Sequence, residues 1–202
     1  MKRFPLAALL MLWAVAIPAQ KVDADTPVQA LQEALIHSMK HGYQSAYAKR
    51  YQALAPVLRR SLDFPFIARL VTGRHWRTLS AEQQQQFTHA FAELSIATYL
   101  GQFKNYSGER FEITGMAPER GGRMKVDSLL HIGAQETVSF EYHLHRTQGR
   151  WSIINILAEG VSDLALKRAE YNRIFKDGGL ASLMPRLKKQ TREYEAQALL
   201  PD

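Results

Sequence analysis

Residues 137–158, with the sequence TVSFEYHLHRTQGRWSIINILA, decide the fold of this chain. In the first half of this stretch every second residue is apolar, as in a β-strand with one buried face: Val138, Phe140, Tyr142 and Leu144. Gln148 and Gly149 then supply a two-residue turn into a second apolar segment. The stretch therefore predicts an antiparallel hairpin with one apolar face.

Two further strands precede this hairpin, so the four predicted strands cover about residues 109–116, 122–131, 137–146 and 150–158. Opposite residues of an antiparallel pair share a face, so matching the apolar faces fixes each register. The second and third strands then align Met124 with Leu144, Val126 with Tyr142, Ser128 with Phe140 and Leu130 with Val138. The third and fourth align Leu144 with Ile153, Tyr142 with Asn155 and Phe140 with Leu157.

This register has consequences for the fourth strand. It places Asn155 on the apolar face, where a buried amide needs a hydrogen-bond partner that the Tyr142 hydroxyl can supply. It turns Ile154 and Ile156 to the opposite face, where we expect a terminal helix to cover them, with a docking surface as the alternative. Asn155 is therefore either a polar anchor in a pocket or a structural hydrogen-bonding residue.

Helical patterns flank the strands on both sides. Residues 26–42, 43–60 and 66–70 are predicted as helices, and Ser80 with Gln83 forms a capping-box pattern that opens a long helix to about residue 103. Two closing helices, 162–177 and 180–198, are separated by two glycines. The layout predicts an α+β fold in which a four-stranded antiparallel meander is wrapped by N- and C-terminal helices.

The N-terminus has the pattern of a secretory signal peptide. Lys2 and Arg3 precede an apolar run at residues 6–17, which is too short to span a bilayer comfortably. We expect a signal peptide at residues 1–24, with an uncleaved N-terminal anchor as the alternative. A single domain is expected at residues 25–202.

The composition narrows the classes of function. The 202 residues include no cysteine, which excludes disulfides, thiolate metal sites and cysteine nucleophiles. The net charge of +7 favours anionic partners, but the basic residues are scattered, so no nucleic-acid partner is predicted. One basic helix face is either a solvated surface or a docking surface for anionic headgroups or an acidic partner: Arg186, Lys188, Lys189 and Arg192.

Two histidine pairs have spacings that metal sites use. His143 and His145 lie two apart on a strand, but the register puts Lys125 beside His143 and Arg123 beside His145, and it supplies no third ligand. His37 and His41 lie one helical turn apart at a helix C-terminus, where histidine suits the carbonyl groups. We therefore predict no metal site at either pair.

The inward-facing residues form the candidate binding site. One sheet face is expected to oppose an apolar face of the helices, and the pattern leaves open whether these side chains fill a closed core or line a cavity. The candidate residues are Ile67, Leu70, Phe87, Phe91, Leu94, Tyr99, Val126, Leu130, Val138, Phe140, Tyr142, Leu144, Ile153, Asn155 and Leu157.

Several segments together resemble the toluene-tolerance, or Mla-type, lipid carriers. Residues 73–77 (GRHWR) and 80–83 (SAEQ), followed by Phe87, Phe91 and Tyr99, resemble the central helix of that family. Residues 151–155 (WSIIN) and 159–162 (EGVS) resemble its last strand and turn, and residues 179–187 fit its C-terminal helices. Residues 103–111 and 162–168 are similar to a branch associated with hopanoid biosynthesis.

The resemblance implies a periplasmic carrier that holds a phospholipid, or a hopanoid-type lipid, with its tails inside a nuclear-transport-factor-like cone. It also implies lipid exchange with an inner-membrane ABC transporter, its lipid-binding subunit and an outer-membrane lipid complex, without metal or organic cofactor. The family commonly has Asp where this chain has Asn155.

Two other functions remain open. One is an envelope scaffold that binds no lipid, which predicts a filled core and a partner surface. The other is an enzyme in a similar cone, which needs an acid–base pair on the inner wall. The inward polar residues Ser128, Tyr142 and Asn155 supply no such pair, so an enzyme is not expected.

Overall fold

The computed structural model describes residues 23–42, 44–133 and 135–200. The helices in chain order are α1 (Thr26–His41), α2 (Tyr47–Ser61), α3 (Phe64–Thr72), the 3-10 helix η1 (Gly73–Thr78), α4 (Ala81–Gln102) and α5 (Asp163–Gln197). Between α4 and α5 the chain forms β1 (Arg110–Glu119), β2 (Arg123–Ile132), β3 (Glu136–Thr147), β4 (Arg150–Ala158) and β5 (Val161–Ser162). Residues 1–22, which include nearly all of the predicted signal peptide, lie outside the described residues.

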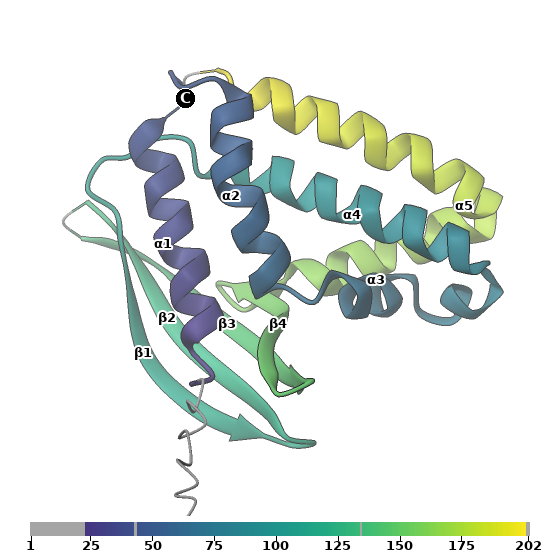
Figure 1. Cartoon of the computed structure of the whole chain (residues 1–202), viewed down its shortest axis with the longest axis horizontal. Coiled ribbons are helices and arrows are strands. Elements are labelled where there is room, and N and C mark those ends of the chain that lie inside the picture. The colour runs from purple at the N-terminus through teal and green to yellow at the C-terminus, as the bar shows by residue number, and fades with distance from the viewer. Residues whose placement is uncertain (1–22, 43, 134, 201–202) are drawn as a thin grey trace, which may run out of the picture.

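The predicted α+β order of helices, antiparallel meander and helices is confirmed (Figure 1). The sheet has five strands in the order β1-β2-β3-β4-β5, whereas the sequence predicted four. The fifth strand pairs only Val161 and Ser162 with the end of β4. Two residues are too few to produce a periodic pattern, so this strand could not be read from the sequence.

The helix boundaries follow local capping signals. The Ser80 hydroxyl accepts a hydrogen bond from the Gln83 amide at 3.2 Å, and the Gln83 side chain accepts one from the Ser80 amide at 2.9 Å, so the predicted capping box begins α4. Asp63 caps α3 by accepting a hydrogen bond from the Phe66 amide at 2.9 Å. The second helix begins at Tyr47, later than the predicted residue 43.

The glycine pair divides α5 into two helical halves, as predicted. Gly178 and Gly179 leave the helical conformation, and Gly179 has φ +63°, which glycine adopts without strain. The first half lies beside α3 and the second half returns along α4 (Figure 1). A Cβ atom at Gly101 of α4 would lie 3.3 Å from the Tyr194 ring, so glycine permits this close approach.

The register of β2 and β3 agrees with all four predicted pairs. Met124 lies opposite Leu144, Val126 opposite Tyr142, Ser128 opposite Phe140 and Leu130 opposite Val138. The inner face of the sheet is therefore the predicted apolar face. The alternation determined this register, because a shift of one residue would expose the apolar set; it is strict over residues 137–145 of β3 and is broken on β2 by Ser128 and Leu129.

The predicted register of β3 and β4 is wrong beyond Ile153. A β-bulge at Ile154 shifts the pairing, so Tyr142 lies opposite Ile156, and His143 lies opposite Asn155. Ile156 therefore shares the inner face with Tyr142, while Asn155 and Leu157 share the outer face with His143 and Glu141. This is the opposite of the predicted facing for all three β4 residues, whereas Ile154 is buried as expected.

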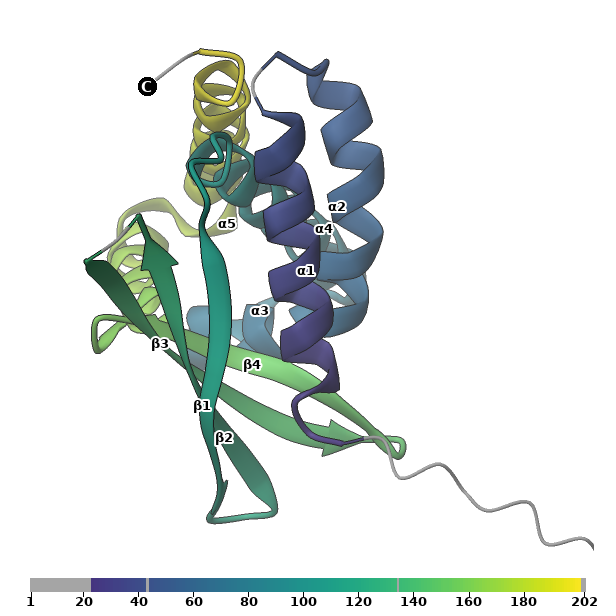
Figure 2. The same ribbon diagram turned by 90° about the vertical axis from the view of Figure 1, so that its left-hand side faces the viewer.

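The helices cover the inner face of the sheet. α1 and α2 lie side by side, and α1 stands over the strands with Val28, Leu31 and Leu35 buried (Figure 2). α3, α4 and the two halves of α5 pack together at the end of β4. No helix in the described part of the chain is long and apolar enough to cross a membrane.

Candidate functional site

Most of the predicted site residues meet in one apolar cluster between the sheet and the helices. Eight are buried in it: Ile67, Phe87, Phe91, Leu94, Val126, Tyr142, Leu144 and Ile153. Tyr99 and Phe140 pack against its margin. Because α1 inserts Val28, Leu31 and Leu35 into the same cluster, these side chains form a filled core.

The remaining predicted residues lie outside this cluster. Leu130 is buried, while Leu70 and Val138 are half-buried. Asn155 and Leu157 are displaced to the outer face by the β4 bulge. Asn155 accepts a hydrogen bond from the Ser162 hydroxyl at 2.9 Å, so its partner is not Tyr142.

A buried polar cluster joins α1 to the inner face of the sheet. The Gln32 side-chain amide donates to the Ser128 hydroxyl at 2.9 Å and to the Tyr142 hydroxyl at 3.3 Å. All three residues are at most 6% exposed, and burial raises the pKa of Tyr142 to about 12. These bonds satisfy the polar groups of an otherwise apolar interface and fix the position of α1.

A groove of about 740 Å³ runs between α1 and α2. Small or apolar side chains form most of its length: Ala30, Ala34, Ala53, Leu54 and Val57. Its α1 wall extends from Thr26 to His37, a rise of roughly 16 Å along the helix axis. Its volume lies within the ~300–1,000 Å³ typical of ligand pockets, and its length matches the ~15 Å depth of one bilayer leaflet.

One end of the groove is basic. Arg60 ends α2, Arg150 begins β4, and both line the groove together with the half-buried Trp151. The start of α1 at Thr26 lies at the same end. The groove thus combines a cationic rim with a largely apolar trough, to which α1 also contributes the polar residues Glu33, His37 and Ser38, and this combination suits an amphipathic ligand.

Two other hollows are less suited to a long apolar ligand. A groove of about 700 Å³ on the β1 side of α1 is lined largely by polar and charged side chains, including Gln29, Glu33, Lys40 and Arg110. A cavity of only about 60 Å³ lies between β4, α3, α4 and the start of α5. Five predicted site residues line this small cavity: Ile67, Phe91, Tyr99, Ile153 and Asn155.

The groove residues were missed by the sequence reading. Val28, Leu31 and Leu35 form the buried face of α1, whereas Ala30 and Ala34 lie one helical turn apart on a neighbouring face. Two alanines at that spacing, followed by Ala53 and Val57 on the next helix, were the available signal. Small residues on facing helices leave room between them.

The histidines of both pairs form hydrogen bonds within the protein. His143 bonds to Glu119 at 2.9 Å and His145 to Asp63 at 2.8 Å, so each has a carboxylate partner of its own. His41 bonds to the carbonyl of His37 at 2.9 Å. Across the part of the chain that the structure describes, no three histidine, aspartate or glutamate side chains gather as a metal site would require.

The fold and the groove define a helix-covered antiparallel sheet with an amphipathic groove beside its core. The chain belongs to the MlaC protein family, whose pattern matches residues 29–189. The match includes all of the helices and strands that build the groove and the core, apart from the first residues of α1 and the last residues of α5.

A solved structure from Ralstonia solanacearum has a similar fold. It is described as a phospholipid-binding protein in complex with a phospholipid. The two chains are 21% identical and superpose with a TM-score of 0.75, over 86% of this chain and 99% of the other. At this identity the likeness establishes the shared fold.

Proposed function

We propose that this protein is a lipid carrier that binds a phospholipid with its tails against the α1–α2 groove and the core beneath it. The main support for this proposal is the apolar trough with a cationic rim, in a chain of the MlaC family. The phospholipid complex of the Ralstonia protein, which has the same fold, supports the ligand class. Binding and release of an intact lipid require no acid–base pair, so we do not propose an enzyme.

The energetics set what such a site must provide. Removal of a lipid tail from water gains about 0.8 kcal/mol per methylene, so two ordinary tails amount to roughly 25 kcal/mol. A carrier must offer nearly the same apolar environment as the membrane, because a poorer one would not extract lipid and a better one would not release it. A trough open along one side meets this condition more easily than a sealed cavity.

The groove accommodates one tail, and the predicted core residues form the deeper part of the site. Leu54 belongs both to the groove lining and to the core, so the two regions are continuous. A second tail reaches the core when α1 separates from the sheet, to which Gln32 holds it. In that state the sheet curves around the tails as the predicted cone, lined by Ile67, Leu70, Phe87, Phe91, Leu94, Tyr99, Val126, Leu130, Val138, Phe140, Tyr142, Leu144 and Ile153.

The proposed cellular location rests on the sequence. The signal-peptide pattern of residues 1–24 supports a periplasmic location for the domain at residues 25–202. There the carrier exchanges lipid with an ABC transporter and its lipid-binding subunit at the inner membrane, and with a lipid complex at the outer membrane. Phospholipid is the proposed cargo, and a hopanoid-type lipid is the variant that residues 103–111 and 162–168 suggest.

A second candidate is an envelope scaffold that binds no lipid. The filled core favours it, because a scaffold needs no room for tails. The two functions differ in one property: a carrier purified from the periplasm without detergent contains lipid, whereas a scaffold does not.

The test is mass spectrometry of the lipid extracted from such protein. The carrier predicts near-stoichiometric phospholipid, and a hopanoid would identify the branch.

Ala34→Trp fills the trough and should lower the lipid content several-fold, whereas Ala48→Trp, on an exposed position of α2 outside the groove, should not. Phe140→Arg tests the deeper part in the same assay. A folded Ala34→Trp protein with normal lipid content would refute the groove, and lipid-free wild type that also takes none from liposomes would support the scaffold.

A further inference from the structure

The cationic rim of the groove contains two arginines that come from different elements. Arg60 lies in the last turn of α2, and Arg150 is the first residue of β4. An isolated bridge between Leu62 and Ile153 holds the end of α2 alongside the start of β4. The fold therefore brings both guanidinium groups to one end of the groove.

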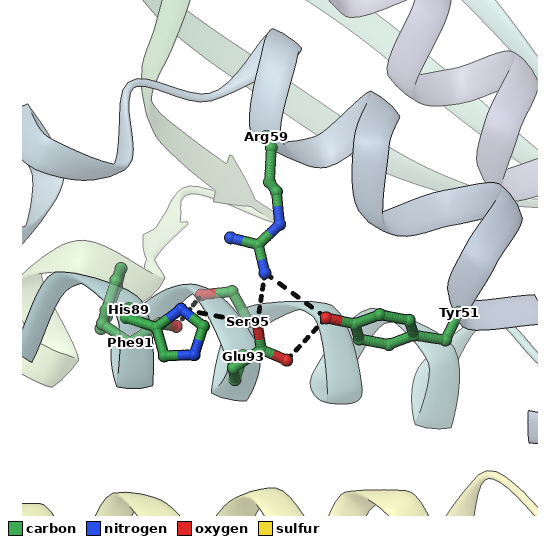
Figure 3. A network of polar contacts seen from close by, with 6 residues as sticks. All are labelled: Tyr51, Arg59, His89, Phe91, Glu93 and Ser95. Atoms are coloured by element: carbon green, nitrogen blue, oxygen red, sulfur yellow. Dashed lines mark hydrogen bonds and ion pairs between the residues drawn. The ribbon is translucent and has the colours of Figure 1, made fainter. Parts of the chain in front are cut away.

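The preceding arginine is engaged elsewhere. Arg59 forms an ion pair with Glu93 of α4 and donates to the Tyr51 hydroxyl at 3.4 Å, while Tyr51 donates to Glu93 at 2.7 Å (Figure 3). His89 lies 4.0 Å from the same carboxylate. This network joins α2 to α4 and holds the guanidinium of Arg59 against Glu93. Arg60 itself points to a different surface, the groove.

The two rim arginines have no such partner. Within residues 23–42, 44–133 and 135–200, neither guanidinium group makes an ion pair or a side-chain hydrogen bond. Asp63 shares a neighbouring depression with Arg150, but His145 and the Phe66 amide occupy its two oxygens. Glu33 is the carboxylate that lines the groove itself, and it forms no ion pair with either arginine. Two cations therefore line an apolar groove without a compensating anion bound to them.

We propose that Arg60 and Arg150 together bind the phosphate of the lipid headgroup at the end of the α1–α2 groove. This inference rests on the proposed lipid-carrier function and adds the group that orients the ligand. A guanidinium presents paired N–H donors that match phosphate oxygens, and it is held here without an internal competitor. The phosphate lies at the rim, and one tail runs from it along Ala30 and Ala34 toward His37.

Trp151 fits the boundary that this placement creates. It adjoins Arg150 in sequence, lines the groove and packs against the core with part of its surface exposed. Indole rings concentrate where headgroups meet acyl chains in membranes, because one edge is polar and the rest is apolar. The arginine, tryptophan and alanine side chains of the groove thus suit the phosphate, the glycerol region and the tail of a phospholipid.

The test compares two lipids with the same tails, with and without a phosphate. Delipidated wild-type protein, an Arg60→Gln/Arg150→Gln variant and an Arg120→Gln/Arg123→Gln control are titrated with dioleoylphosphatidylglycerol and with dioleoylglycerol. The control removes the same charge from the exposed β1–β2 turn, away from the groove. We expect wild type and control to prefer the phospholipid by about ten- to a hundred-fold, and the rim variant to bind both lipids equally. Glu33→Gln should increase the preference, which a folding defect would not do.

The outcomes separate this inference from the function on which it rests. Wild type that binds neither lipid overturns the carrier function and the phosphate site together. Wild type and rim variant that bind both lipids with unchanged ratios overturn the phosphate site alone. Inorganic phosphate and glycerophosphoglycerol serve as soluble probes. Tight binding of either probe without loss of bound phospholipid would assign the arginines to a free anion and overturn the headgroup assignment.

Discussion

Replacement of Arg50 by methionine should greatly lower the free energy of unfolding of this protein. Arg50 lies in α2 and is 2% exposed, and its guanidinium donates to the carbonyls of Leu100 at 2.7 Å, Phe103 at 3.1 Å and Ala198 at 3.0 Å. These carbonyls end α4 and α5. One buried cation thus binds the C-terminal ends of two helices to a third, and burial lowers the pKa of Arg50.

The size of the effect follows from what the variant leaves behind. A hydrogen bond to a charged group contributes about 1.5–3 kcal/mol, and each buried carbonyl without a donor costs about 1–3 kcal/mol. The variant no longer has to bury a cation, and the desolvation free energy that this saves offsets part of the loss. The net expectation for Arg50→Met is a loss of about 3–5 kcal/mol, as for the removal of one partner from a buried charged pair. That is a large part of the ~5–15 kcal/mol stability of a typical domain.

Urea unfolding followed by circular dichroism measures this loss. Arg50→Lys keeps the charge but can reach fewer carbonyls than the planar guanidinium, so it should recover only part of the stability. Lys49→Met, at the adjacent exposed position, removes a charge of the same sign and should leave the midpoint nearly unchanged. A loss below about 1 kcal/mol for Arg50→Met would refute the reasoning, because the buried Leu100 and Ala198 carbonyls lose their donor and the Phe103 carbonyl keeps only the Ser38 hydroxyl at 3.5 Å.

Two further predictions concern the contact of α1 with the sheet. Gln32→Leu removes the amide that joins Ser128 and Tyr142, and it should lower the unfolding free energy by about 1–3 kcal/mol in the same urea assay, whereas Gln29→Leu, at an exposed position of α1, should not. The second prediction is a loss of stability at alkaline pH, since burial raises the pKa of Tyr142 to about 12. Its contribution is complete below the unfolded-state pKa of about 10 and disappears as the pH rises through 12, a loss of about 2–3 kcal/mol that Tyr142→Phe should abolish. An identical pH profile for wild type and Tyr142→Phe would contradict this assignment.

The predictable part of the fold was the part with strict periodicity. The β2–β3 register could be derived because apolar and polar residues alternate strictly on β3 and for the most part on β2, so one alignment buries the apolar set best. β4 lacks this information, because Ile153, Ile154, Ile156 and Leu157 are all apolar and either face can be the buried one. A bulge at Ile154 changes nothing in the local pattern, yet it reverses the facing of every later residue.

The site was less predictable than the fold because its features depend on contacts between distant segments. Arg60 and Arg150 lie far apart in the sequence and line one groove because the end of α2 lies beside β4, as the bridge of Leu62 to Ile153 shows. In the sequence, Gln32 resembles any polar residue of a helix. Its role is visible only in the structure, where it donates hydrogen bonds to Ser128 and Tyr142. The predicted apolar residues did assemble, but whether such residues fill a core or surround a ligand depends on the helix that covers them.

The filled core and the carrier function are compatible if lipid loading exchanges one set of apolar contacts for another. Separation of α1 from the sheet exposes Val28, Leu31 and Leu35, at a cost of about 1.5–3 kcal/mol for each side chain left in water. A tail that takes the place of α1 against the sheet covers the same surface, so the exchange is nearly neutral. Tail contacts then contribute little to the choice between membrane and carrier. The headgroup contacts at Arg60 and Arg150 become the principal term by which the protein retains a phospholipid, and their loss should therefore affect retention more than a comparable change within the core.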